Sequence, residues 1–431
     1  METGLRVAIG LDRWWTIGNV LRELVAGSIG SCRWLRSQGS KEPIEEVSLS
    51  RILVVATAGA GGDLQPLVAA ALGLRNRGHE LVFLGDRSVR RTLVGLGFDA
   101  ETLPAELDLG TRLVGATRDA MAATGGDLAA AGPLVEQRMA AWAEEMAQPV
   151  VERTGRHRPA AILTSLFGVE VLHLASPPCP WAVVNSTFYV GPTPPRPLQH
   201  DFNPRAVPLI SRYASLLGSA TLVLHATDQT FDYSFDRLPQ GHHYVGPLGI
   251  WEPPGEPPGY LDEPGDSWVL VSISSQLQDD VPLAEAALAA LANRRVRVML
   301  TLGPDHDPGE LSSVPANARG EHMVSHAAVL ERGLLLVSHA GHGSVMKALW
   351  YGRPMLLVPW GRDQPGVAAR ASALGVAEVV PRQDVSAESL SAGVDRVLAR
   401  DDMRETASRH AMRLQATDPP VVAASLVESL L

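Results

Sequence analysis

The chain has 431 residues, a formal net charge of −10 and only two cysteines, Cys32 and Cys179. This length is sufficient for two domains that each bury a core. The acidic balance, with no cluster of Lys or Arg, argues against a nucleic-acid partner, and no apolar run is long enough to span a membrane. Two isolated cysteines exclude a disulfide framework and a cysteine zinc site, and they indicate a cytoplasmic protein.

Residues 1–48 are predicted to be an N-terminal extension. Trp14, Ile17, Leu21 and Leu24 recur at helical spacing, so a short amphipathic helix is expected there. An extension packed on the surface, or upstream sequence wrongly assigned as coding, is favoured over a helix that binds a membrane surface or a partner. The sequence does not assign a role to this segment.

A regular alternation of strands and helices begins at Arg51. Strands are predicted at 52–56, 81–84, 161–164, 182–185 and 222–225, and helices at 64–77 and 134–153. Such alternation predicts a parallel sheet with right-handed crossovers. We therefore expect a Rossmann-like domain over residues 51–247.

A proline-rich stretch within 248–266 reads as a linker, and after it the alternation starts again. Strands are predicted at 268–272, 296–300, 333–338 and 354–359, with a helix at 283–291. A second Rossmann-like domain is expected over 267–415, followed by a C-terminal helix within 416–431 that packs back across the domains. The predicted fold class is α/β, with two parallel-sheet domains that face a cleft.

The most informative motif follows the strand at 333–338. His339 is followed at once by a glycine-rich turn that contains Gly341 and Gly343, and a helix is expected to start at Ser344. The free backbone N–H groups of a helix start, together with the helix dipole, favour a phosphate. A phosphate contact is therefore preferred for His339 over a purely local role, whereas His342 is interpreted as a loop residue. Ser344 is expected to be both a helix N-cap and a phosphate ligand.

A second polar group follows the strand at 354–359, in the segment from Trp360 to Gln364. Asp363 and Gln364 emerge at the carboxyl edge of the predicted sheet, where ligands of open α/β sheets bind. A carboxylate and an amide suit vicinal hydroxyls. We therefore expect a sugar attached to a diphosphate, in preference to a helix cap beside a surface amide.

The first domain has its own strand–turn–helix, with Asp63 at the start of the helix. Gly59 and Gly61 fit the dinucleotide fingerprint, but Leu64 stands where its third glycine should be. Asp63 could be a plain N-cap. Its place opposite a sugar-diphosphate site favours a general base that deprotonates an acceptor hydroxyl.

Residues 51–415 resemble the UDP-glycosyltransferase superfamily, which consists of inverting enzymes of the GT-B fold, and most closely its actinobacterial natural-product branch. The resemblance implies that His339, Gly341, Gly343 and Ser344 bind the diphosphate. It further implies donor contacts from Asp363, Gln364, Trp360, Ser274, Ser275 and Val324. Met323 stands where relatives often carry the aromatic residue that stacks on the base.

Many members of this family carry a catalytic histidine, oriented by an aspartate, where this chain has Asp63. Ser165 lies near the expected place of the orienting aspartate, so that dyad is absent. The pattern resembles the sterol and glycopeptide branches, in which an aspartate is the proposed base.

The resemblance predicts transfer of a hexose or deoxyhexose from a UDP- or dTDP-sugar to a small lipophilic acceptor, without a metal or other cofactor. Phe188 and Tyr189 precede a proline-rich loop and are expected to be exposed acceptor contacts, with aromatic packing as the alternative. A monomer or homodimer is expected. The competing functions are a non-catalytic sugar-nucleotide-binding accessory protein, a sugar-nucleotide epimerase and, least favoured, a nicotinamide oxidoreductase.

Overall fold

The computed structural model describes residues 49–57, 62–125, 128–189, 207–233, 238–275, 278–303, 306, 309 and 311–431. Leu49–Leu431 form one compact unit. The predicted extension at 1–48, the turn at 58–61 and the proline-rich loop after Tyr189 lie outside the described residues. In the part that is described, no helix is long and apolar enough to cross a membrane.

The first sheet has seven strands in the order β3-β2-β1-β4-β5-β6-β7, and every neighbouring pair is parallel. Its strands are β1 (Arg51–Val55), β2 (Glu80–Gly85), β3 (Asp99–Thr102), β4 (Ala161–Ser165), β5 (Trp181–Asn185), β6 (Leu222–His225) and β7 (His242–Tyr244). The five strands predicted here are all present. The edge strands β3 and β7 were not predicted, because both are short and neither is an apolar run.

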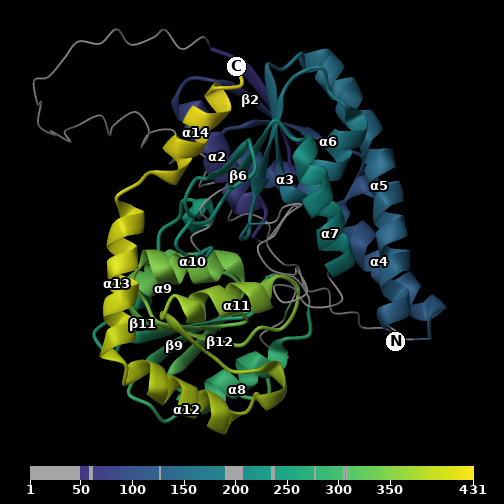
Figure 1. Cartoon of the computed structure of the whole chain (residues 1–431). Coiled ribbons are helices and arrows are strands. Elements are labelled where there is room, and N and C mark those ends of the chain that lie inside the picture. The colour runs from purple at the N-terminus through teal and green to yellow at the C-terminus, as the bar shows by residue number, and fades with distance from the viewer. Residues whose placement is uncertain are drawn as a thin grey trace, which may run out of the picture. The chain divides into compact units, whose positions relative to one another are not determined.

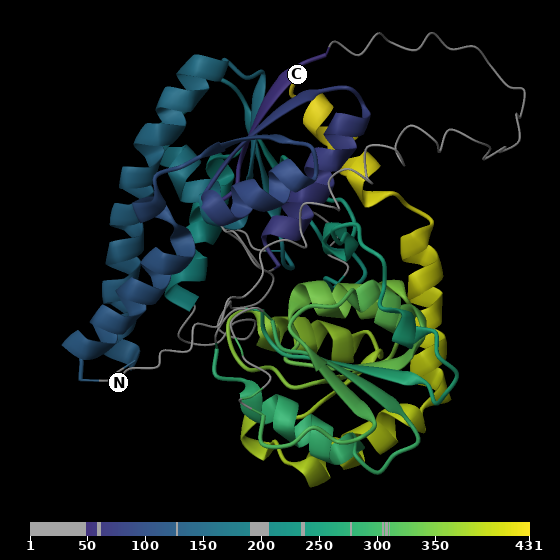
Figure 2. The same cartoon turned by 180° about the vertical axis from the view of Figure 1, so that it is seen from behind.

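Alternate residues of β1 face two different cores, as a strand buried on both faces requires. Leu53 and Val55 belong to the core that also contains Trp142 and Met146 of α5, whereas Ile52 and Val54 pack with α2. Accordingly, α5, α6 and α7 cover one face of the sheet, and α2 and α14 cover the other (Figures 1 and 2). The helices of this half are α2 (Leu64–Asn76), α3 (Arg87–Gly95), α4 (Leu109–Ala123), α5 (Leu128–His157), α6 (Val169–Ala175) and α7 (Val207–Leu216).

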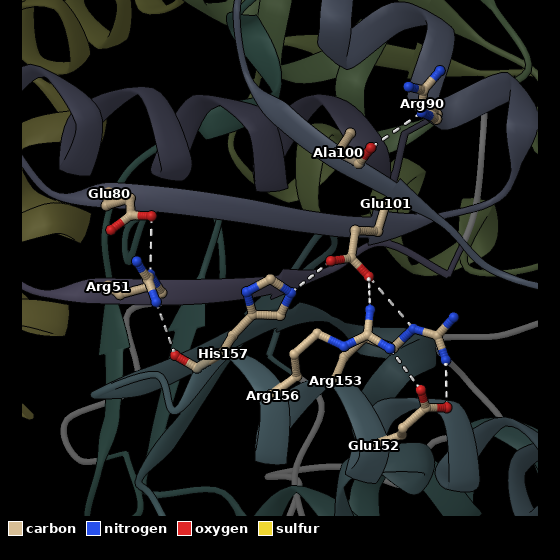
Figure 3. Close-up of polar contacts among 9 residues, drawn as sticks. All are labelled: Arg51, Glu80, Arg90, Ala100, Glu101, Glu152, Arg153, Arg156 and His157. Carbon is tan, nitrogen blue, oxygen red and sulfur yellow. Dashed lines mark hydrogen bonds and ion pairs between the residues drawn. The ribbon is translucent and has the colours of Figure 1, made fainter.

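A polar network fastens the C-terminal end of the long helix α5 to the sheet (Figure 3). Glu101 of β3 accepts a bond from His157 Nε2 at 2.7 Å and pairs with Arg156 at 3.4 Å. Arg51 joins the carboxylate of Glu80 at 2.9 Å to the backbone carbonyl of His157 at 3.3 Å. Arg51 and Glu80 are the first residues of β1 and β2, so these contacts lie at the amino ends of those strands. The Arg51–Glu80 pair is therefore structural, because ligands of such sheets bind at the opposite, carboxyl edge.

The second sheet has six parallel strands in the order β10-β9-β8-β11-β12-β13. These are β8 (Trp268–Ser272), β9 (Arg297–Thr301), β10 (Ala318–Glu321), β11 (Gly333–Ser338), β12 (Met355–Leu357) and β13 (Ala377–Val379). One face packs on α9, α10 and α11, and the other on α8 and α12 (Figure 1). The helices are α8 (Val281–Leu291), α9 (His326–Glu331), α10 (His342–Trp350), α11 (Gln364–Ala373), α12 (Ala387–Leu398) and α13 (Asp401–Gln415).

The C-terminal helix α14 (Pro419–Glu428) returns to the first half, as predicted. Its buried residues Ala423, Ala424 and Val427 join the core on the α2 face of the first sheet. The Glu428 carboxylate contacts the side chains of Arg77 at 2.6 Å and His79 at 3.0 Å, and both of these residues lie just beyond the end of α2. The two parallel-sheet halves and the returning helix confirm the predicted fold class, whereas the exact domain limits stay predictions.

Candidate functional site

The carboxyl ends of three neighbouring strands place the candidate base and its partners together. Asp63 follows β1, Ser165 ends β4, and Ser186 directly follows β5. Because β1, β4 and β5 are adjacent and parallel, these residues meet at one edge of the sheet. Ser186 Oγ donates a hydrogen bond to Asp63 Oδ1, and the Ser165 hydroxyl also acts on this carboxylate and lowers its pKa.

The side chain of Asp63 is not a helix cap. It flanks α2 but makes no capping bond, and it is only 6% exposed. Its Oδ2 atom is buried and has no hydrogen-bond partner among the residues that the structure describes. Burial raises the pKa of Asp63 from 3.8 to about 6, the charge of Asp363 adds to this rise, and the two serine hydrogen bonds oppose it. A carboxylate with a free oxygen and such a pKa is suited to accept a proton near neutral pH.

The next residue, Thr187, connects the first half of the chain to the second. Its Oγ1 donates a hydrogen bond to Asp363 Oδ2. Ser186 and Thr187 therefore hold the candidate base and the candidate sugar-binding carboxylate on consecutive residues. Sequence reasoning missed both; their position directly after a predicted strand end was the available signal.

In the second half, three more neighbouring strands deliver the predicted donor residues to one edge. Ser274 and Ser275 follow β8, His339 follows β11, and the segment from Trp360 to Gln364 follows β12. The strands β8, β11 and β12 are adjacent and parallel. The structure thus brings together the residues that were predicted to bind a diphosphate and a sugar.

His339 is buried, and the bond made by one ring nitrogen defines its tautomer. Its Nδ1 atom lies 3.1 Å from the carbonyl oxygen of Ser272, which can only accept, so Nδ1 carries the proton. Burial is the largest cause of a lowered His339 pKa, and the charge of Arg362 acts in the same direction. The neutral ring therefore has an unprotonated Nε2. It can donate to a phosphate oxygen, as predicted, only after taking up a second proton, which a bound diphosphate would favour.

The helix after His339 begins two residues earlier than predicted. Gly341 is the N-cap of α10, so Ser344 lies inside the first turn and is not the cap. The N–H group of Val345 donates to the carbonyl of Gly341 at 3.0 Å and is therefore not free to bind a phosphate. A Cβ at Gly341 would lie 2.5 Å from His339 Nε2, so only glycine fits this turn beside the ring.

His342, which was interpreted as a loop residue, instead opens α10 and is buried. Its ring packs edge-on against Phe231, with centroids 6.1 Å apart. Burial lowers its pKa to about 3, so the ring is neutral. Its Nε2 has no partner among the described residues.

Gln364 and Trp360 shape the turn after β12. Gln364 is buried, and its Oε1 accepts the backbone N–H groups of Trp360 at 2.8 Å and Gly361 at 2.7 Å. Its Nε2 donates to Gln278 Oε1 at 2.9 Å. The Trp360 ring is buried under the guanidinium of Arg382, 4.3 Å from the ring centroid. Both residues thus support the loop that presents Asp363.

The loop after β8 is held by a buried carboxylate. Asp280 Oδ2 accepts the N–H of Ser274 at 2.8 Å. The turn after β9 packs closely against this loop. Its Gly303 has φ +79°, and a Cβ there would lie 2.7 Å from Ser275 Cα. Val324 lies farther along the edge, between β10 and α9, next to the exposed Met323.

The prediction that Phe188 and Tyr189 are exposed is wrong. Both side chains are buried, at 0% and 4% exposure. Phe188 lies under the guanidinium of Arg370, 3.7 Å from the ring centroid, and the Tyr189 N–H donates to Asp232 at 2.5 Å. Aromatic packing, the alternative interpretation, describes what these two side chains do here.

The described residues contain no group of three or more His, Cys, Asp or Glu side chains placed to hold a metal ion. The candidate site consists of a carboxylate with a free oxygen, a second carboxylate, an imidazole, hydroxyls and the start of a helix. This set can remove a proton on one side and bind an anion on the other.

The chain is similar to known proteins in both sequence and fold. Residues 285–429 match the model of the erythromycin biosynthesis protein CIII-like C-terminal domain. Demethyllactenocin mycarosyltransferase of Streptomyces fradiae is 29% identical over 208 residues, which are 47% of this chain and 43% of that relative. O-mycaminosyltylonolide 6-deoxyallosyltransferase of the same organism is 25% identical over 418 residues, 83% of this chain and 92% of the relative. The match to the first of these relatives therefore spans less than half of its length.

Among solved structures, the spinosyn rhamnosyltransferase SpnG complexed with thymidine diphosphate matches with a TM-score of 0.63 and 20% identity. The match covers 88% of this chain and 99% of that one. The fold is therefore the GT-B fold of glycosyltransferases. Within this class, the matches confirm the resemblance to UDP-glycosyltransferase-like proteins of the natural-product type.

Proposed function

We propose that this protein is an inverting glycosyltransferase that moves a hexose or deoxyhexose from a UDP- or dTDP-sugar to a hydroxyl of a small lipophilic acceptor. The observation that carries the proposal is the environment of Asp63. Its free Oδ2, its pKa near 6 and its link through Ser186 and Thr187 to Asp363 support the assignment of Asp63 as the base and of Asp363 as a donor contact. The relatives support sugar transfer, since they are named as a mycarosyltransferase and a 6-deoxyallosyltransferase, and a solved neighbour is a rhamnosyltransferase complexed with thymidine diphosphate.

In the proposed reaction, Asp63 Oδ2 takes the proton of the acceptor hydroxyl. The hydroxyl oxygen attacks the anomeric carbon from the face opposite the diphosphate, which gives inversion. The bond from the anomeric carbon to the phosphate oxygen breaks, and the nucleoside diphosphate leaves with the electron pair. His339 and the N–H groups of Gly343 and Ser344 stabilise the charge that develops on it.

Asp363 accepts a hydrogen bond from the hydroxyl of Thr187. A donor-sugar hydroxyl has the same chemistry, so we assign Asp363 to the sugar. We further propose that the reaction requires no metal, because protein donors face the leaving group, and that the enzyme works in the cytoplasm, where nucleotide sugars are made.

The test is a mass-spectrometric assay with UDP-glucose, UDP-GlcNAc and a panel of dTDP-deoxysugars. Each donor is incubated with EDTA, with and without a pool of phenols and macrolides. We expect acceptor-dependent release of nucleoside diphosphate and a product whose mass has increased by one sugar. Asp63→Asn is expected to bind the donor normally and to lose transfer by at least 100-fold, since general base catalysis contributes 10²–10⁴-fold.

Other outcomes identify the alternatives. Isomerisation of a donor without acceptor would indicate an epimerase, and donor binding without any turnover would indicate an accessory protein. Unchanged transfer by Asp63→Asn would remove Asp63 as the base, and turnover that stops with EDTA would show that a metal is required.

A further inference from the structure

Arg362 is a charged residue of the candidate site to which sequence reasoning gave no role. It lies in the turn after β12, directly before Asp363. Its φ is +52°, in the left-handed region that non-glycine residues rarely adopt because it is strained. Such strain is often retained at binding sites because it directs a side chain.

The guanidinium of Arg362 is directed along the edge of the second sheet. Its Nη1 donates to Ser274 Oγ, in the loop after β8, at 3.3 Å. Its charge also acts on His339, after β11, and lowers the pKa of that imidazole. The side chain therefore reaches two of the elements that were predicted to bind the diphosphate.

No ion pair within 4.0 Å neutralises this guanidinium among the residues that the structure describes. The charges of Asp363 and Asp280 act on Arg362, but both carboxylates have other hydrogen-bond partners. Asp280 Oδ2 accepts hydrogen bonds from the Ser274 N–H at 2.8 Å and from Gln278 Nε2 at 2.9 Å, and Asp363 Oδ2 accepts one from Thr187. Arg362 remains accessible to solvent. A cation with one bond to a hydroxyl and several free N–H groups can accept an incoming anion without breaking a salt bridge.

We propose that Arg362 binds the diphosphate of the nucleotide donor, with Ser274 beside it, and compensates the negative charge of the leaving group. This inference rests on the proposed function, because it assumes a nucleoside-diphosphate donor. Arg362 and Asp363 are consecutive but point to different partners: Asp363 faces Thr187 of the first half, whereas Arg362 faces Ser274. The turn thus separates a cation for phosphate from a carboxylate for sugar. A planar guanidinium can give a phosphate two parallel hydrogen bonds, which a lysine cannot.

The experiment measures binding of UDP, dTDP, UMP and dTMP to the full chain by isothermal titration calorimetry. For Arg362→Gln we expect at least a tenfold increase in the Kd of the diphosphate that binds, and a smaller change for the corresponding monophosphate. Arg362→Lys keeps the charge but loses the two parallel hydrogen bonds of the guanidinium. Its Kd should therefore lie between those of Arg362→Gln and the wild type. Arg295→Gln is the matched control, because it removes the same charge from a side chain that is 95% exposed.

The outcomes distinguish a failure of the role of Arg362 from a failure of the proposed function. A wild-type protein that binds none of the four nucleotides would overturn both the inference and the proposed function. Normal binding by the wild type and equal binding by Arg362→Gln would overturn the role of Arg362 alone. If Arg362→Gln has a folding defect, visible as a thermal transition at lower temperature, Arg362→Lys decides the test. Wild-type affinity and wild-type preference for the diphosphate in Arg362→Lys would then overturn the proposal.

Discussion

At the scale of the residue, Asp63 shows how a site can be kept reactive at the expense of stability. Its carboxylate is buried beside a second carboxylate and keeps one oxygen without a partner among the described residues. Two serine hydroxyls stabilise the ionised form only in part. The fold therefore tolerates an unfavourable charge at the position that we propose for the base.

This leads to a pH-dependent prediction for Asp63→Asn. The pKa of Asp63 is about 6 in the folded state and 3.8 when unperturbed, so the ionised form disfavours folding. A difference of about two pKa units corresponds to roughly 3 kcal/mol. The cost is full above pH 6 and disappears as the pH falls towards 4. We expect Asp63→Asn to raise the free energy of urea unfolding at pH 8, by up to about that amount, and to leave it nearly unchanged at pH 4.

Asp395→Asn is the matched control, with the opposite sign. The bond from Arg294 lowers the pKa of Asp395, so its ionised form favours folding above its unperturbed pKa, and this contribution is lost as the pH falls. The Asp395 variant should therefore be less stable than the wild type at pH 8. An Asp63→Asn effect of equal size at pH 4 and pH 8 would contradict the raised pKa.

At the scale of the element, the site depends on strands that end at the same edge and on helices that hold the two sheets. The helix α14 is distant in sequence from α2 but packs directly on it. A Cβ added at Gly73 of α2 would lie 2.2 Å from the carbonyl oxygen of Pro420 in α14. The absence of a side chain at Gly73 is therefore what permits this contact.

We predict that Gly73→Ala lowers the free energy of unfolding by about 1–3 kcal/mol, the usual cost of overpacking, because the methyl group pushes α14 away from α2. Gly115→Ala in α4 is the control, since a Cβ there meets nothing within 4 Å. That variant should be more stable by up to ~1 kcal/mol through helix propensity alone. Urea unfolding of both variants tests the pair, and a stabilising Gly73→Ala would show that α14 does not pack as described.

At the scale of the whole molecule, two ion pairs join helices of the C-terminal half to the segment between β6 and β7. Arg370 of α11 meets Asp232 at 2.6 Å, and both side chains are almost fully buried. Asp232 also accepts the Tyr189 N–H and the Tyr244 hydroxyl. Arg413 of α13 meets Asp228, but its side chain is 43% exposed. The buried pair thus links α11, which begins at Gln364, to Asp232, and Asp232 in turn holds the Tyr189 backbone just after Ser186 and Thr187.

Removal of Arg370 from the fully buried pair should be more costly than removal of Arg413, whose side chain is 43% exposed although its partner Asp228 is buried. We expect Arg370→Met to lower the free energy of unfolding by about 3–5 kcal/mol, because Asp232 is left as an uncompensated buried charge. Arg413→Met should cost about 1 kcal/mol or less. Adding Asp232→Asn to Arg370→Met should recover part of the loss. Equal effects of the two single variants in urea unfolding would show that the Arg370 pair is not buried in solution.

Most of the central architecture could be predicted from the sequence, because the signals are local. The strands at 222–225, 268–272 and 333–338 are apolar runs, and their bounds in the structure are the predicted ones. The edge strands β3 and β10 were missed because their residues are mostly half-exposed and polar. The residues of the turns predicted that helices begin after His339 and at Asp63. The start of α10 was nevertheless predicted two residues too late.

The sequence by itself determined the two parallel sheets and the residues at their carboxyl edges, since strand periodicity and glycine turns act over a few residues. Only the tertiary structure decided which of these residues meet. Thr187 and Asp363 are 176 positions apart, and Arg370 and Asp232 are 138 apart. The burial of Phe188, the raised pKa of Asp63 and the direction of the Arg362 side chain likewise depend on neighbours from distant segments. Burial and charge are properties of a packed environment, and no short stretch of chain contains them.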